Sequence, residues 1–213
     1  MNLSEMRTRV RQDLRDTDSS SYRWTDAELD RHIDHAVRDV GVAAPLQAKA
    51  TLATSGGGRD ISVAALAGLV AIEAVEYPAG LYPASYVPFR QWEATLTLLV
   101  DGVPAAGGQV TVYYGKLHTL DAGSSTLPSR LEELAALGAA AYAALAWASF
   151  ATNRINVGGD TTWQNYLAWG QDRMAAFLRG LAQHSRKNAL RVRHLYAPAT
   201  PLPWKGQSTD WGP

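Results

Sequence analysis

Apolar residues recur at helical spacing in the first part of the chain. Met6, Val10 and Leu14 lie one helical turn apart and predict a helix over residues 4–15, with Ser4 as its N-cap. A second predicted helix begins after Thr25, because Thr25 and Glu28 have the spacing of a capping box. Its apolar face carries Leu29, Ile33, Ala36, Val37 and Val40, its opposite face is charged, and Pro45 ends it.

Between residues 48 and 117 the pattern changes to the alternation typical of strands. Predicted strands cover residues 50–54, 60–63, 69–77, 95–100 and 109–114. The glycine-rich stretch at 55–58 predicts a hairpin or a tight reversal between the first two, and the turn at 104–108 predicts that 95–100 pairs with 109–114. The region is therefore expected to form a small antiparallel β module.

Helical pattern returns at Pro128. An alanine-rich helix is predicted over residues 128–153, and its stretch between Glu133 and Arg154 has no charged residue. That length is near what a bilayer requires, but alanine gains little from lipid, which favours a buried central helix over a membrane span. A second capping box, Thr161 with Gln164, predicts a last helix to residue 187, with Trp163, Tyr166, Leu167, Met174, Phe177, Leu178 and Leu181 facing inward.

The fold class predicted from these elements is α+β and mainly an α-helical bundle. Two N-terminal helices (1–47) and two long Ala-rich helices (121–190) form the bundle, a small antiparallel β module (48–120) is inserted between them, and an extended C-terminal arm (191–213) follows. The expected core of the bundle contains Leu29, Ile33, Val37, Tyr142, Leu145, Phe177 and Leu181.

The composition of the chain argues against several classes of function and of site. The formal net charge is zero, from 20 basic and 20 acidic residues, which argues against a surface devoted to nucleic acid. The chain has no cysteine, which excludes disulfides, thiolate zinc sites and cysteine nucleophiles. No signal-peptide pattern opens the sequence, so we expect synthesis in the cytoplasm.

Catalytic and metal motifs give weak signals. His32 and His35 lie one helical turn apart, but no third ligand has a suitable spacing, and a solvated polar face is the favoured interpretation. The glycine-rich stretch at 55–58 lacks the Lys-Ser/Thr pair of a P-loop. We therefore expect no enzyme activity, no metal and no cofactor.

The C-terminal part carries the candidate interaction residues. A basic cluster, Arg186, Lys187, Arg191 and Arg193, is a candidate contact to DNA or to an acidic partner, or else a favourable charge at a helix C-terminus. The arm beyond is rich in proline yet keeps large apolar side chains, which favours docking on a partner over a disordered tail. The alternative is that the arm folds back onto its own subunit. The predicted binding residues are Leu195, Tyr196, Leu202, Trp204 and Trp211.

The chain resembles the head–tail adaptor (head completion, connector) proteins of tailed bacteriophages. The resemblance rests on the junction Tyr22-Arg23-Trp24-Thr25-Asp26-Ala27-Glu28-Leu29 and on the order of two helices, a β insertion, Ala-rich helices and an extended tail. The resemblance implies a structural virion protein at the head–tail junction. It would form a homo-oligomeric, dodecameric ring below the portal protein, join capsid to tail, and extend a channel through which DNA passes without sequence-specific contact.

The same resemblance implies that tail or stopper proteins bind to the ring and that the arm binds the portal. The residues alone leave two other classes of protein possible. One is a non-viral intracellular helical interaction module that binds a partner through its C-terminal arm. The other is a nucleic-acid-binding regulator, whose affinity for free DNA would depend on salt.

Overall fold

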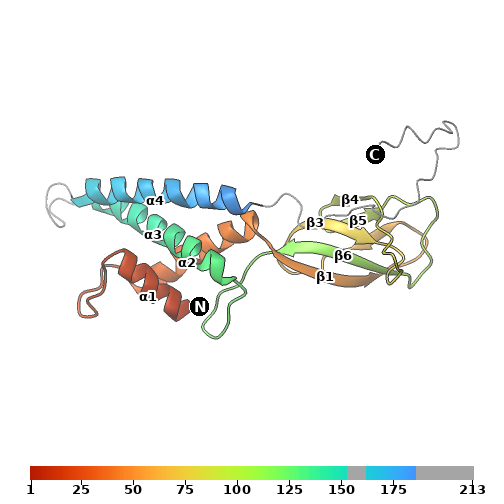
Figure 1. The fold of residues 1–213 in the computed structure, drawn as a ribbon, viewed down its shortest axis with the longest axis horizontal. Coiled ribbons are helices and arrows are strands. Elements are labelled where there is room, and N and C mark those ends of the chain that lie inside the picture. Colours follow the sequence, from red (N-terminus) through yellow and green to blue (C-terminus); the bar gives the residue numbers. More distant parts are fainter. Residues whose placement is uncertain (153–161, 186–213) are drawn as a thin grey trace.

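The computed structural model describes residues 1–152 and 162–185. Helices gather at one end of an elongated molecule and strands at the other (Figure 1). The fold class is α+β, as predicted. The helices are α1 (Leu3–Asp13), α2 (Asp26–Ala43), α3 (Ser129–Thr152) and α4 (Thr162–His184). The strands are β1 (Leu46–Ala53), β2 (Asp60–Ser62), β3 (Leu69–Glu76), β4 (Phe89–Trp92), β5 (Thr95–Leu98) and β6 (Gln109–Lys116).

Helix α3 is the centre of the helical bundle and packs against α1, α2 and α4. Its alanines let the neighbouring backbones approach closely, and Gly138 gives room to the Phe177 ring, which a Cβ at that position would meet at 2.7 Å. By length and composition α3 is apolar enough to cross a membrane, but 61% of its most apolar window is buried inside the protein. The expectation of a buried central helix is confirmed.

The predicted bundle core is largely present. Leu29, Ile33, Val37 and Phe177 are buried, whereas Tyr142, Leu145 and Leu181 are half-buried, and of these Tyr142 and Leu181 pack against the buried core. The prediction that Leu178 faces inward is wrong, since its side chain is 55% exposed. Leu178 directly follows Phe177, and the turn of about 100° per residue carries it off the buried face of α4.

Capping decides where the first two helices begin. Thr25 caps α2 as predicted, because its hydroxyl accepts from the Glu28 N–H at 3.3 Å and the Glu28 carboxylate accepts from the Thr25 N–H at 2.7 Å. The prediction of Ser4 as the cap of α1 is wrong. Asn2 is the cap instead, and it forms with Glu5 a capping box whose two hydrogen bonds are both 2.9 Å.

The β module contains two three-stranded antiparallel sheets, with strand orders β1-β6-β3 and β2-β5-β4. Side chains from both sheets fill a second core, separate from that of the bundle, that includes Ile61, Val75, Leu96, Leu98, Val110 and Val112. Strand β4 was not predicted, since only Phe89 of its residues is even partly buried.

Both predicted strand pairings are wrong. Strand β1 pairs with β6 rather than with β2, and β5 pairs with β2 and β4 rather than with β6. The two glycine-containing turns meet instead at one end of the β1–β6 pair, where the Thr54 N–H donates to Gly108 O at 2.9 Å and the Gly107 N–H donates to Thr54 O at 2.8 Å. Alternation defines which face of a strand is buried but does not define its neighbour.

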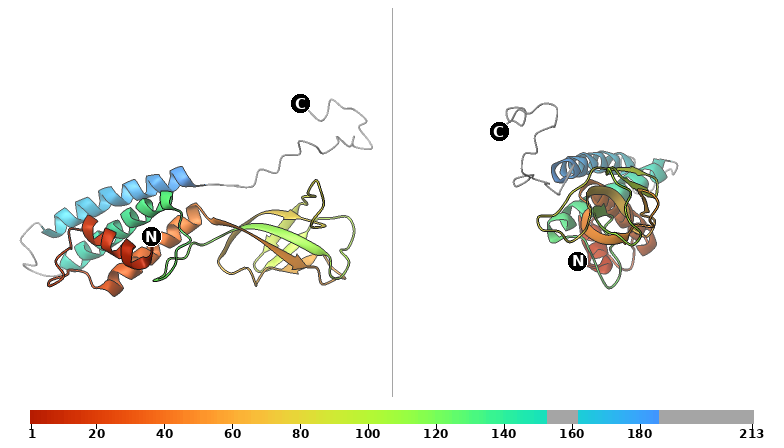
Figure 2. Two further views of the ribbon diagram at one scale, coloured as in Figure 1. Left: turned by 60° about the horizontal axis from the view of Figure 1, so that its bottom comes forward. Right: turned by 90° about the vertical axis from the view of Figure 1, so that its right-hand side faces the viewer.

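The bundle and the β module are joined by two chain segments, one from α2 to β1 and one from β6 to α3 (Figure 2). The buried His118 ring ties them together, with Nε2 3.0 Å from Ala44 O and Nδ1 3.0 Å from Thr126 O. Close backbone approach completes the joint, because a Cβ on Gly115 would lie 2.6 Å from Pro45 Cβ.

Candidate interaction surfaces

All the predicted binding residues of the C-terminal part lie outside residues 1–152 and 162–185. These are the basic cluster (Arg186, Lys187, Arg191, Arg193) and the arm residues (Leu195, Tyr196, Leu202, Trp204, Trp211). The predicted capping residue Thr161 is also outside the described part. Their roles therefore stay predictions.

The last described part of the chain is the end of α4 with Ser185 after it. His184, the last residue of α4, and Arg130, in the first turn of α3, line the same groove. This end of the bundle is the one that adjoins the β module (Figure 1). The described part of the chain thus ends beside the joint between the bundle and the β module.

An aromatic cluster closes the opposite end of the bundle. Trp24 is 3% exposed, and its ring meets the rings of Trp147 and Tyr166 edge-on, with centroids 6.0 Å apart in both pairs. The Arg23 guanidinium lies 4.9 Å from the Trp147 ring centre and 5.0 Å from that of Tyr166. Trp24 therefore ties the start of α2 to α3 and α4, a long-range contact that its position before a cap did not reveal.

Of the histidine pair of α2, only His35 lies on the exposed face that the sequence favoured. His32 is 7% exposed, and burial, followed by the nearby Arg31, lowers the pKa of its imidazole. The His35 ring stacks on Tyr142 with centroids 4.1 Å apart. Within residues 1–152 and 162–185 no three His, Asp or Glu side chains are grouped to hold a metal ion.

The β module exposes large apolar side chains that are not among the predicted binding residues. Tyr82 is fully exposed, Leu81 beside it is 52% exposed, and Trp92 is 76% exposed. The loop after β3 that presents Leu81 and Tyr82 is anchored by the buried Glu76 carboxylate, which accepts from the Gly80 N–H at 2.8 Å and from the Tyr113 hydroxyl at 3.1 Å.

Burial together with the Glu76 hydrogen bond raises the pKa of Tyr113 to about 12, so the hydroxyl stays a donor at neutral pH. Exposed aromatic side chains held on an ordered loop are typical of surfaces that bind other proteins. No part of this arrangement has the nucleophile, base and oxyanion donors of a catalytic site.

This combination of a helical bundle, an inserted β module and exposed apolar side chains defines a class of structural interaction proteins. Residues 1–193 match the model of the SU10 adaptor protein family, and the chain belongs to that family. It is accordingly a structural virion protein of the phage adaptor class and not an enzyme. The resemblance to phage head–tail adaptors is confirmed, and the non-viral alternative is set aside.

Two solved structures are similar to this chain at low identity. One is a chain in the neck of an empty gene transfer agent particle, with 17% identity, 80% of this chain and 88% of that chain covered, and a TM-score of 0.30. The other is a chain of the virion of a native gene transfer agent particle, with 17% identity, 79% and 88% covered, and a TM-score of 0.29. Overlap at this level adds nothing to the family assignment. No curated protein matches the chain.

Proposed function

We propose that this adaptor protein forms a homo-oligomeric ring below the portal protein, joins the capsid to the tail and extends the channel for DNA. The observation that carries the proposal is the family match, which spans residues 1–193 and so includes the bundle, the β module and the basic cluster. In this proposal the ring is a dodecamer, and tail or stopper proteins bind to its free side.

The arm is the proposed attachment to the portal. Tyr196, Trp204 and Trp211 supply large apolar faces with a polar edge, the residue types enriched at binding hot spots. The prolines of the arm restrict its free conformations, which lowers the entropy lost on docking. Since α4 ends at His184, removal of the arm leaves every described helix and strand intact.

Deletion of residues 198–213 tests the role of the arm. We expect the truncated protein to keep its circular dichroism spectrum and melting temperature but to lose stable attachment to the portal, measured by co-sedimentation. A second variant replaces Tyr196, Trp204 and Trp211 by alanine in the full-length chain. It should lose attachment in the same way, which would assign the loss to the aromatic side chains rather than to the shortened chain. Heads that retain DNA and accept tails with the truncated protein would show that the arm is not the anchor.

The ring is tested separately by mass measurement of the full chain with the portal protein. We expect the adaptor to add a large integral multiple of 23.0 kDa to the mass of the portal. Addition of a single copy would contradict a ring and support a one-to-one interaction.

The basic cluster is tested by salt. Contact with DNA predicts an affinity for free duplex that falls steeply as the salt concentration rises, whereas contact with a protein partner does not require binding of free DNA.

A further inference from the structure

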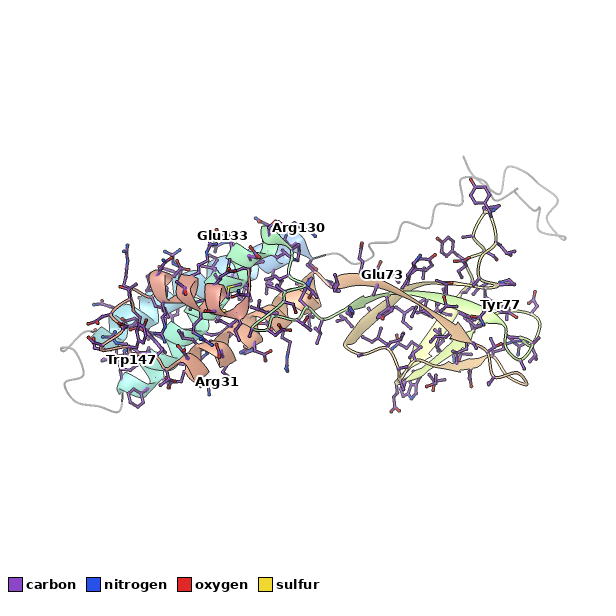
Figure 3. All side chains as sticks on the ribbon, turned by 90° about the horizontal axis from the view of Figure 1, so that it is seen from below. Arg31, Glu73, Tyr77, Arg130, Glu133 and Trp147 are labelled. Atoms are coloured by element: carbon purple, nitrogen blue, oxygen red, sulfur yellow. The ribbon has the colours of Figure 1, made fainter. Side chains whose placement is uncertain are left out.

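A groove with a cationic rim runs along the bundle between α3 and α4 and is bounded by the end of α1. It encloses about 520 Å³, and three arginines line it: Arg130 from α3, and Arg173 and Arg179 from α4. We call it the arginine groove. Figure 3 shows Arg130 near the β-module end of the bundle and Glu133 further from that end along the same edge.

The floor of the arginine groove is apolar. Leu134, Leu137 and Trp169 line it, and the Arg173 guanidinium lies 5.2 Å from the centre of the Trp169 ring. This cation–π contact holds one charge of the rim above an aromatic surface. The groove therefore offers apolar area for burial beneath positive charges.

The charges of the rim are not neutralised within the groove. Among the described residues Arg130, Arg173 and Arg179 take part in no ion pair, whereas Arg7 and Arg11 of α1 each bind two carboxylates. Of the two carboxylates that line the groove, Glu133 is already paired with Arg9, which leaves Asp13 against three guanidinium groups. The net charge of the lining is positive.

We infer that the arginine groove binds an acidic segment of a partner protein whose apolar side chains reach the floor between the arginines. Guanidinium groups bind carboxylates through two parallel hydrogen bonds, and burial of apolar peptide side chains on the floor stabilises the complex. Duplex DNA presents phosphates and sugars to such a rim and leaves the apolar floor uncovered, so the chemistry of the floor favours a protein ligand. The inference concerns the groove alone and does not depend on the arm or on the portal.

Binding of short fluorescent peptides to the full-length chain tests this inference. The probe is a peptide that alternates glutamate and leucine, and the comparison peptide has lysine in place of glutamate. We expect the acidic peptide to bind with an anisotropy change that weakens at high salt, and the lysine peptide not to bind. Equal binding of the two peptides, or no binding of the acidic one, would overturn the inference.

Charge reversal locates the site. The double variant Arg173→Glu/Arg179→Glu should weaken binding of the acidic peptide by about tenfold or more, since it removes two guanidinium partners of the peptide carboxylates and puts two repelling carboxylates in their place. The matched control is Lys49→Glu/Arg90→Glu, which reverses two exposed cations of the β module and should bind as the unchanged protein does. Circular dichroism checks that both variants are folded.

Two outcomes would assign the groove to another occupant and overturn the inference. Displacement of the acidic peptide by a short DNA duplex, with duplex affinity lost in Arg173→Glu/Arg179→Glu, would make the groove a DNA site. A change in the mass of the protein alone in the same variant, absent in the β-module control, would make a second copy of the chain the occupant.

Discussion

The Arg11 guanidinium donates to the Asp16 carboxylate at 2.6 Å, and both side chains are only 7% exposed. Arg11 also donates to Trp24 O at 2.9 Å and to the Asp26 carboxylate at 2.8 Å. Asp16 in turn accepts from the backbone N–H of Arg23 at 2.8 Å. This network joins α1 to the start of α2 and orients the turn that carries Trp24 into the aromatic cluster.

Replacement of Asp16 by asparagine should therefore be severely destabilising. The change leaves the buried Arg11 charge paired only with the more exposed Asp26 carboxylate, and loss of one partner of a buried pair costs up to about 3–5 kcal/mol. Urea unfolding at neutral pH measures the loss. The matched control is Asp34→Asn, which removes the exposed pair with Arg38 at 3.6 Å and should change the free energy of unfolding by less than about 1 kcal/mol. Equal effects of the two variants would contradict the structural importance of the network.

Two adjacent residues of α4 should respond differently to truncation. Phe177 is fully buried against α3, so Phe177→Ala should cost about 3–5 kcal/mol of stability through lost burial and the cavity it leaves. Leu178 is 55% exposed, and Leu178→Ala should cost much less. Thermal melting of the two variants side by side checks this, and a larger loss for Leu178→Ala would show that its surface is covered in solution.

The buried His32 predicts a pH dependence of stability. Burial lowers the pKa of His32 below its ordinary value of 6.5, so between the folded-state value and 6.5 the unfolded chain binds more protons than the folded one. Stability is therefore full above pH 6.5 and declines as the pH falls toward the folded-state pKa. The groups that face the ring electrostatically are Glu28, which opposes the shift, and Arg31 and His35, which support it.

The test of this dependence is the comparison of the unchanged chain with His32→Gln. The variant should show a flatter decline in the free energy of unfolding as the pH falls below 6.5, because glutamine has no proton to gain. His35→Gln is the comparison: it removes an exposed imidazole of the same helix and the smallest cause of the lowered His32 pKa, so most of the decline should stay. An unchanged pH profile in His32→Gln would show that the imidazole keeps its ordinary pKa in the folded protein.

Local signals in the sequence identified the start of α2 well, whereas long-range partners could not be read from it. The capping box of Thr25 and Glu28 lies within one helical turn, so the two residues define their own contacts. Trp24 directly precedes that capping box, yet its ring meets Trp147 and Tyr166, which are far along the chain. Only the packing of α3 and α4 brings those rings together.

The strand pairings and the arginine groove also depend on long-range contacts that local patterns in the sequence do not predict. Five of the six strands were expected from alternation, but both pairings were wrong because several strands offer equally suitable apolar faces. Arg130 is separated from Arg173 and Arg179 by most of α3 and α4, and none of the three belongs to the basic cluster noticed in the sequence. Antiparallel packing of the two helices is what assembles them.

The joint between the bundle and the β module gives a last prediction, at Gly115 of β6. A Cβ there would lie 2.6 Å from Pro45 Cβ and 3.1 Å from Pro45 Cγ, and the proline ring is rigid and cannot turn aside. Alanine in a strand gains about 0.5–1 kcal/mol over glycine through reduced freedom of the unfolded chain. The forced shift of β1 against β6 costs about 1–3 kcal/mol, so the net effect of Gly115→Ala should be destabilising. Gly102→Ala is the control, because no atom lies within 4 Å of a Cβ at that position. Urea unfolding of the two variants measures the difference, and equal stability would mean that the joint yields to the extra methyl group without loss.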